Sequence, residues 1–247
     1  QGIHNALPVI HGAQGCGFLG KVLLTKHFRE PIALATSKLF VEDVVMGSEE
    51  RLTKTVKDFI DKSEPDLIAV LTSGLSEVKG DDVETVVRSQ EAGVRGKERK
   101  TRIVHVATPD FAGGLELGYA KAVEAIVTSI VECGNTNASS PLPLPFKGRE
   151  KGGDGSLRNA ELPQVNILSG SHLTPGDINE LRDIVESFGL RPVILPDLSS
   201  LDGSREGFSG LSKGGTSLED IRSMGTSLQT LAIGRSMERA AGILKSR

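Results

Sequence analysis

Short, continuous runs of apolar residues recur along the chain and alternate with stretches of helical periodicity. Most of these runs show no alternation with polar residues, a pattern typical of parallel strands that helices cover on both faces. A further apolar run at residues 6–10 leads into a glycine-rich loop. The predicted strands lie at residues 32–35, 67–71, 103–107, 165–168, 192–195 and 228–233.

Helical periodicity fills the stretches between the strands. Ser48 is predicted to cap one helix, and Thr174 to cap another, with Pro175 in its first turn and Asp177 at the positive end of its dipole. Gly189 is well placed to end that second helix. The expected apolar faces are Leu52, Val56, Phe59 and Ile60 after Ser48, then Tyr119, Val123, Ile126, Val127 and Ile130, and finally Ile178, Leu181, Ile184, Val185 and Phe188.

The alternation of strands and helices predicts the α/β class, with right-handed crossovers. We expect two Rossmann-like, doubly wound units with parallel sheets flanked by helices, at residues 1–133 and 163–247. The stretch 134–162 is rich in proline, glycine and polar residues, and is predicted to be a flexible linker or insertion. The chain lacks an initiator Met, and no capping signal follows its last helix, so we expect a fragment with an incomplete second unit.

Composition narrows the possible partners and the setting. The 247 residues carry a net charge of −3 with both signs interspersed, and no basic stripe or aromatic platform suggests nucleic acid. No apolar run approaches the roughly 20 residues that span a bilayer. The first residues lack the pattern of a signal peptide. Cys16 and Cys133 cannot form a disulfide framework, so a reducing, cytoplasmic setting is predicted, with Cys133 as buried filler near a helix end.

The densest chemical signal is the sequence His-Gly-Ala-Gln-Gly-Cys-Gly at residues 11–17, before a helix-like segment at 18–28. Its glycines let the backbone approach a bulky ligand closely. Cys16 is open to three interpretations: a small buried residue in a tight turn, a reactive thiol, or a metal ligand. Because a [4Fe–4S] cluster normally needs four thiolates, a ligand role would require another chain.

Other loops follow predicted strands, where ligands gather in open α/β sheets. In the loop at 72–82, Asp81 and Asp82 are predicted to cap the next helix, and Glu77 has no assigned role. The glycines of the loop at 108–114 could approach a ligand or simply permit a turn. The loop at 213–217 is only loosely similar to a phosphate loop. Without metal-ligand spacing, four histidines are expected at the surface or in packing: His4, His27, His105 and His172.

At these same loops the chain resembles the nitrogenase component 1 family. Residues 11–16 are similar to the family's His-Gly-Ser-Gln-Gly-Cys loop, with Ala13 in place of serine. The resemblance covers nearly the whole chain except 134–162, and a third α/β domain of the family is missing. Further blocks in the family's order and spacing lie at residues 27–31, 76–82, 108–111, 171–177, 188–192 and 196–199.

Within this family, the blocks are most similar to the N subunit of the scaffold on which the iron–molybdenum cofactor is assembled. Gly74 stands where the catalytic β subunit has a further cysteine ligand of its eight-iron cluster. The resemblance implies that Cys16 is a metal ligand to a [4Fe–4S] cluster shared with a homologous E subunit in a heterotetramer. It also implies that the complex holds a precursor of the iron–molybdenum cofactor and that the nitrogenase iron protein docks transiently.

Two other functions stay open at this point. A catalytic β-type nitrogenase subunit would need more cysteine ligands than this chain has. A nucleotide- or sugar-binding α/β domain without iron would use its glycine-rich loops to hold phosphates. The resemblance leaves open whether the chain is itself an enzyme, and whether its system uses molybdenum or vanadium.

Overall fold

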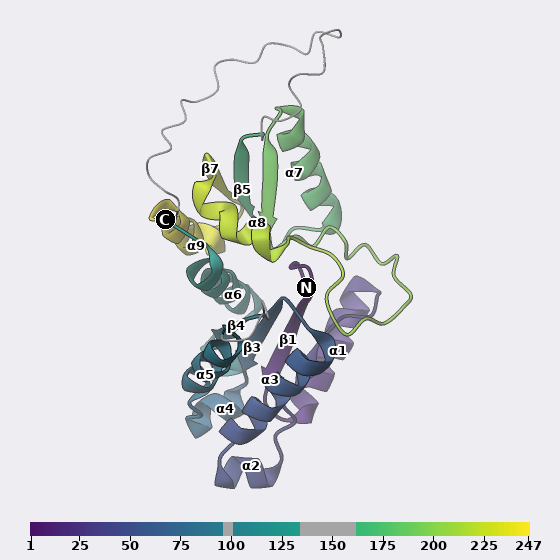
Figure 1. Ribbon diagram of the computed structural model, residues 1–247. Helices are drawn as coiled ribbons and strands as arrows, with labels where there is room; N and C mark the ends of the chain where they lie inside the picture. The colour runs from purple at the N-terminus through teal and green to yellow at the C-terminus, as the bar shows by residue number, and fades with distance from the viewer. Residues whose placement is uncertain (96–100, 134–161) are drawn as a thin grey trace.

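The computed structural model describes residues 1–95, 101–133 and 162–247. They form two α/β units, one above the other in Figure 1, each with a sheet in which every strand pair is parallel. The predicted fold class is therefore confirmed. The segment at 134–161 lies outside the described residues, so the predicted linker and the domain boundaries stay predictions.

The first sheet has the strand order β2-β1-β3-β4. The register places Ala6 opposite Leu67 and His11 opposite Thr72, so β1 and β3 end together at one edge of the sheet. The loops that follow these strands must therefore emerge side by side. The elements of this unit are β1 (Ala6–His11), α1 (Gln14–Phe28), β2 (Ala35–Thr36), α2 (Val41–Met46), α3 (Glu49–Ser63), β3 (Leu67–Thr72), α4 (Gly74–Lys79), α5 (Val83–Arg95), β4 (Arg102–Val106) and α6 (Leu115–Ile130).

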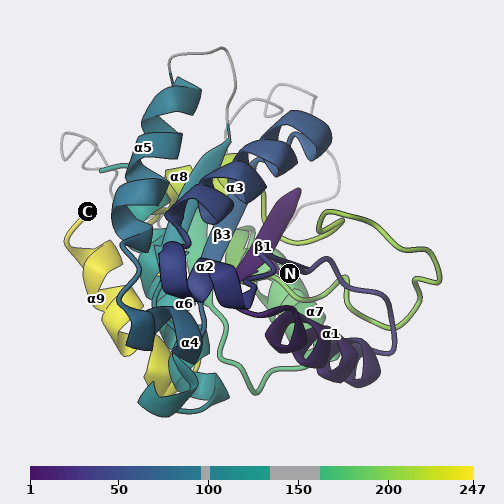
Figure 2. The same cartoon turned by 90° about the horizontal axis from the view of Figure 1, so that it is seen from below.

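Successive residues of each strand point to opposite faces of this sheet, which explains why both faces are apolar. One face, with Leu7 and Ile68, packs against α3 and α5. The other, with Leu67 and Val104, packs against α6. Figure 2 shows α3 and α5 on one side of β3 and α6 on the other.

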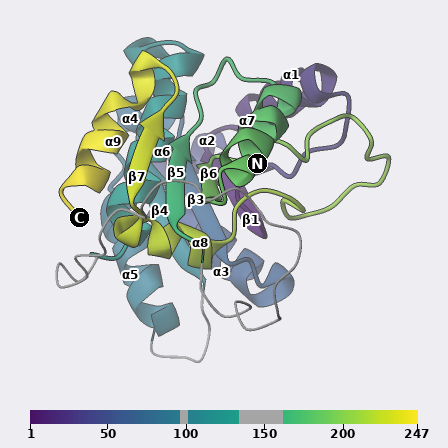
Figure 3. The same cartoon turned by 90° about the horizontal axis from the view of Figure 1, so that it is seen from above.

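The second sheet has the order β6-β5-β7 and shares a core with the first. Val127 of α6 is fully buried in one apolar cluster that includes both Leu67 of β3 and Leu168 of β5. The far face of β5 packs against α7, which lies opposite α9 in Figure 3. The elements are β5 (Gln164–Leu168), α7 (Pro175–Ser187), β6 (Arg191–Leu195), α8 (Leu218–Ser223), β7 (Gln229–Ala232) and α9 (Glu238–Lys245).

The local signals at both ends of α7 were good predictors. The hydroxyl of Thr174 accepts a hydrogen bond from the backbone N–H of Asp177, whose carboxylate accepts from the backbone N–H of Thr174. This capping box satisfies donors that the first turn of α7 leaves free. Gly189 has a positive φ of 72°, so it ends the helix as expected.

Three expectations of the apolar pattern were wrong: the full strand at 32–35, and the burial of Ile184 and of Phe188. The strand predicted at 32–35 is only the two-residue β2, because Ile32 and Ala33 are buried without joining the sheet. On α7, Ile178 and Val185 are buried, but Ile184 and Phe188 are 46% and 63% exposed. The core therefore covers a narrower stripe of this helix than its sequence suggests.

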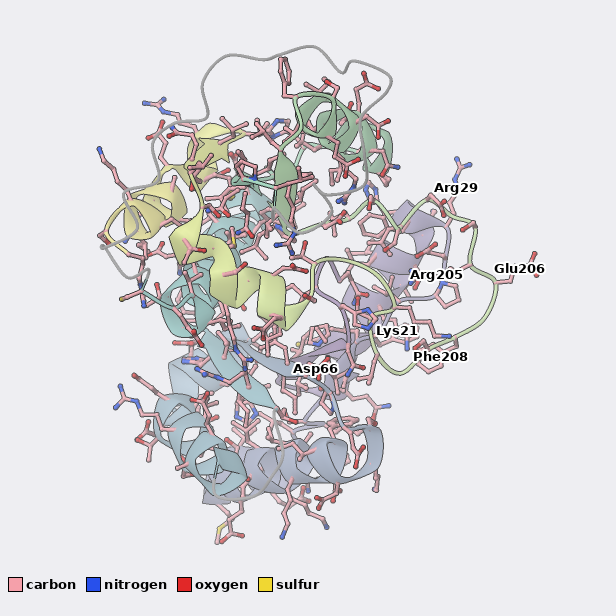
Figure 4. The ribbon with its side chains drawn as sticks, turned by 45° about the horizontal axis from the view of Figure 1, so that its top comes forward. Lys21, Arg29, Asp66, Arg205, Glu206 and Phe208 are labelled. Carbon is pink, nitrogen blue, oxygen red and sulfur yellow. The ribbon has the colours of Figure 1, made fainter. Side chains whose placement is uncertain are left out.

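A long loop at residues 196–217 connects β6 to α8 and returns to the first unit. The backbone N–H of Asn5 donates to the carbonyl of Ser212 (2.8 Å), and the N–H of His4 donates to the carbonyl of Thr216 (3.0 Å). The loop also runs beside α1, where Lys21 Nζ lies 4.3 Å from the centre of the Phe208 ring (Figure 4). Thr216, in the stretch 213–217 that bears a loose likeness to a phosphate loop, is engaged in these backbone contacts.

Candidate functional site

Cys16 lies in the first turn of α1, at the edge of the first sheet where β1 ends. The helix begins at Gln14, four residues earlier than the sequence pattern indicates, so Cys16 belongs to the helix and not to the preceding loop. Its backbone N–H donates to the carbonyl of Ala13 at 3.1 Å. The side chain is exposed, which rules out the interpretation of Cys16 as a small buried residue. Cys133 is also exposed, so its prediction as buried filler was wrong.

Cys16 lines an open pocket of about 610 Å³ at this edge of the sheet. The pocket brings together the three loops that the sequence singled out after β1, β3 and β4, although they are far apart along the chain. Gly74 contributes from the second loop and Asp110 from the third. Besides these three residues, the lining consists of Ile10, Leu71, Thr72, Ser73, Leu75, Val78, Thr108 and Phe111.

Hydrogen bonds hold the backbones of two of these loops together. The N–H of Thr108 donates to the hydroxyl of Thr72 at 3.0 Å, and the hydroxyl of Thr108 donates to the carbonyl of Thr72 at 3.0 Å. The hydroxyl of Thr72 in turn donates to the carboxylate of Glu77. Glu77, to which the sequence assigned no role, thus helps to fix the wall of the pocket.

A buried polar cluster lies behind the start of the Cys16 loop. It is centred on His11, which is completely buried: Nδ1 lies 3.0 Å from the hydroxyl of Ser37, and Nε2 lies 3.2 Å from the hydroxyl of Ser48 and 3.4 Å from a carboxylate oxygen of Asp81. Lys79 forms an ion pair with Asp81 and donates to Ser48 at 3.2 Å. These five side chains link the end of β1 to the segment after β2, the start of α3 and the end of α4.

The cluster corrects two sequence predictions. Ser48 is the N-cap residue of α3, as predicted, but its hydroxyl accepts no hydrogen bond from that helix and contacts His11 and Lys79 instead. Asp81 does not cap α5; its side chain is almost fully buried beside His11. Asp82 does act as predicted, since its carboxylate accepts from the N–H of Thr85 at 3.0 Å.

Burial sets the protonation of this cluster. It lowers the pKa of His11 below the ordinary value of 6.5, although the charge of Asp81 and its hydrogen bond oppose the shift. For Asp81, burial raises the pKa, but hydrogen bonds from Lys79 and Ser48 and the charges of Lys79 and His11 outweigh it and leave the pKa lowered. A neutral imidazole beside an ionised carboxylate is therefore the state that the fold stabilises at neutral pH.

We expect acid to destabilise the protein through His11. Its pKa is lower in the folded chain than in the unfolded chain, so the unfolded state binds the proton first as pH falls below 6.5. The free energy of unfolding should therefore decline as the pH falls below about 6.5 and until it has passed the lowered pKa of the folded state. Urea denaturation across this range measures the slope. A His11→Asn variant should have a shallower slope, and an unchanged slope would contradict the assignment.

The mouth of the pocket exposes apolar side chains. Leu75, Val78 and Phe111 are 39%, 78% and 68% exposed, although each also lines the pocket. Contiguous exposed apolar surface of this kind marks sites of interaction with another molecule. Val78 and Phe111 together make this opening suited to coverage by a second polypeptide.

The described residues offer a metal only one thiolate at this pocket. Within residues 1–95, 101–133 and 162–247, no group of three or more His, Cys, Asp or Glu side chains could hold a metal ion. In particular, His4, His27, His105 and His172 form no such group. An exposed, solitary cysteine in an open pocket fits a cluster shared between chains, and does not fit one held by this chain alone.

In the part of the chain that the structure describes, no helix combines the length and apolar character needed to cross a membrane.

Comparisons of the sequence and of the structure with known proteins agree on one family. The model of nitrogenase component 1 type oxidoreductases matches residues 1–247. The chain is 40% identical to the nitrogenase iron–molybdenum cofactor biosynthesis protein NifN of Rippkaea orientalis and 35% identical to NifN of Klebsiella pneumoniae; each match covers 100% of this chain. It covers 50% and 49% of those proteins, so the chain spans about half the length of the curated relatives it matches.

A solved structure described as nitrogenase Cp1 at pH 6.5 has a similar fold. It superposes with a TM-score of 0.80 at 29% sequence identity, over 99% of this chain and 48% of that chain. The arrangement of two parallel α/β units is thus shared with half of a nitrogenase component.

Proposed function

Because this chain belongs to the nitrogenase component 1 family, we propose that it is part of a subunit of the scaffold on which the iron–molybdenum cofactor is assembled. Relatives named for the biosynthesis of that cofactor support this role. Cys16 contributes one thiolate to a [4Fe–4S] cluster that bridges to a partner subunit. The complex as a whole holds the precursor of the iron–molybdenum cofactor.

The exposure of Cys16 in an open pocket is the observation that carries this proposal. A bridging cluster would supply electron storage or transfer, and Cys16 would be the residue of this chain that holds it. The apolar walls at Leu75, Val78 and Phe111 exclude water from the cluster once a partner covers them.

The partner must bring the remaining thiolates to the same opening. We assign this surface to the homologous E subunit of a heterotetramer, because a second chain of the same fold can present its own cysteine loop there. The nitrogenase iron protein docks transiently on the complex. Further apolar surface is available on α1 and around α2, where the exposed side chains are Phe18, Leu19, Val22, Leu23, Phe40, Val41, Val45 and Met46.

A Cys16→Ala variant of the full-length subunit, produced anaerobically with its partner, is expected to lose the iron of the bridging cluster. Removing one of four thiolates exposes a site to water and leaves the cluster labile. Iron analysis and electron paramagnetic resonance of the purified complex measure the loss. Cys133→Ala is the matched control, since its thiol is also exposed but lies outside the pocket lining. Full iron content and an unchanged resonance in Cys16→Ala would reject the ligand role.

The two alternative functions have less support. A catalytic β-type subunit needs further cysteine ligands, and Cys16 is the one cysteine that lines the pocket. A nucleotide-binding domain would need a free phosphate loop, whereas Thr216 and its neighbours contact the backbone of residues 2–4.

A further inference from the structure

The backbone carbonyl of His11, the last residue of β1, is surrounded by donors from the loop after β3. The N–H of Ser73 donates to it at 3.1 Å, and the hydroxyls of Ser73 and Ser76 lie 2.9 Å and 3.0 Å from it. A carbonyl oxygen has two lone pairs, so this one is satisfied entirely by the neighbouring loop. Cys16 follows five residues later, and the turn that leads to it starts from a fixed point.

The same two serines form the capping box of α4. The hydroxyl of Ser73 accepts from the N–H of Ser76 at 3.4 Å, and the hydroxyl of Ser76 accepts from the N–H of Ser73 at 3.0 Å. A capping box by itself requires no contact with a strand. Ser76, which is buried, and Ser73 therefore have a second role beyond starting α4, because they also join that helix to the end of β1.

Gly12, the next residue towards Cys16, packs directly against Ser73. A Cβ atom added at Gly12 would lie 2.5 Å from Oγ and 2.8 Å from Cβ of Ser73. On its other side, the N–H of Gly12 donates to the hydroxyl of Ser37 at 3.2 Å, and its carbonyl accepts from the N–H of Leu39 at 3.0 Å. The turn is thus enclosed from both sides, and Ser73 is the neighbour that also lines the pocket.

The far end of α4 is linked to His11 as well. Lys79, the last residue of the helix, forms an ion pair with Asp81, and a carboxylate oxygen of Asp81 lies 3.4 Å from Nε2 of His11. Both ends of α4 are therefore fastened to one residue of β1. Because α4 carries Leu75 and Val78 at the mouth of the pocket, this wall and the turn before Cys16 form one unit.

We propose that Ser73 and Ser76 are positioning residues for Cys16: they fasten the turn that carries the thiol to the wall of the pocket that faces the partner. The inference rests on the proposed role of Cys16 as a ligand and adds which residues set the place of its sulfur. Neither serine binds iron, since both act through the backbone before Cys16. A ligand that is held in place beforehand loses less conformational freedom when the cluster binds.

The test replaces both serines with alanine in the full-length subunit, produced anaerobically with its partner. The loss of hydrogen bonds of ordinary strength should raise the population of a displaced turn by about tenfold. Amide hydrogen exchange in peptides that cover residues 11–17, followed by mass spectrometry, should accelerate by that factor. The release of cluster iron to a chelator should accelerate similarly. Unchanged exchange in this segment would overturn the proposal.

Thr101→Val is the matched control for a merely structural effect. The buried hydroxyl of Thr101 also donates to a backbone carbonyl, that of Pro65 at 2.7 Å, but it precedes β4 at the opposite end of the sheet. This variant should leave exchange at residues 11–17 and iron release unchanged. If it accelerates both as much as the serine variant does, general destabilisation explains the result and the proposal fails.

A conservative variant supplies the rescue. Ser73→Thr keeps the hydroxyl and should match the native rates of exchange and iron release, whereas Ser73→Ala should be faster in both. If Ser73→Thr is as fast as Ser73→Ala, the hydroxyl does not hold the turn and the proposal is rejected.

Failure of this inference is distinguishable from failure of the proposed function. Retained iron in Cys16→Ala rejects the cluster role, and hydrogen exchange at residues 11–17 then still tests whether the serines hold the turn. If Cys16→Ala loses iron but the double serine variant keeps native exchange or native iron release, only the role of Ser73 and Ser76 is rejected.

Discussion

Replacing His11 with alanine is expected to lower the free energy of unfolding by about 3–4 kcal/mol. The substitution removes a fully buried ring and leaves a cavity at the end of β1. It also deprives Ser37 of one of its two hydrogen-bond partners, at 3.0 Å, and removes one neighbour of the buried Asp81 carboxylate. Urea denaturation at pH 7.5, where the imidazole is neutral, measures the change.

The control for this variant is His4→Ala. His4 is exposed, and a surface substitution of the same chemical type is expected to change stability by less than about 0.5 kcal/mol. Ser37→Ala should fall between the two, because it loses one contact with His11 but leaves a smaller cavity. A loss below about 1 kcal/mol for His11→Ala would mean that the buried cluster is not a major contributor to the fold.

Replacing Gly215 with alanine is expected to destabilise the chain by about 3 kcal/mol or more. Its φ is +92°, where a Cβ atom is strained, and that Cβ would lie 2.3 Å from the carbonyl carbon of Gly2 and 2.6 Å from the nitrogen of Ile3. Backbone atoms cannot rotate away as a side chain can. The substitution therefore separates the loop at 196–217 from the N-terminal segment that it holds.

Gly210→Ala provides the matched control within the same loop. A Cβ at Gly210 would meet nothing within 4 Å, and Gly210 is not among the glycines with positive φ. Alanine there is expected to be neutral or slightly stabilising, since it restricts the unfolded chain. Differential scanning calorimetry compares the two variants, and similar melting temperatures would show that the contact of Gly215 with Gly2 is unimportant.

Sequence reasoning was accurate where the determining interactions are local. The capping box at Thr174 and Asp177 involves residues three apart, and the run of β3 is apolar because helices cover both faces of its sheet. Such features depend on neighbours along the chain or on a periodicity that any covered strand shares. Phe188 was misassigned because periodicity shows which face is apolar but not how wide the covering core is.

The errors about the side chains of Ser48 and Asp81 have another cause. Each residue type is a good helix cap, and each stands before a helix, so the local prediction was the cap. Both instead contact His11, which is 37 residues before Ser48. The preference for a buried, distant partner over a nearby backbone N–H arises only once β1 and its neighbouring elements are packed.

By itself, the sequence determined the alternation of parallel strands with helices, the resemblance to the nitrogenase component 1 family, and Cys16 as the candidate ligand. Only the tertiary structure decided that Cys16 is exposed, that it shares a pocket with Gly74 and Asp110, and that His11 lies in a buried polar cluster behind it. The physical reason is the parallel sheet. It brings the ends of β1, β3 and β4 to one edge, and the contacts made there join residues too far apart along the chain for any local pattern to reveal them.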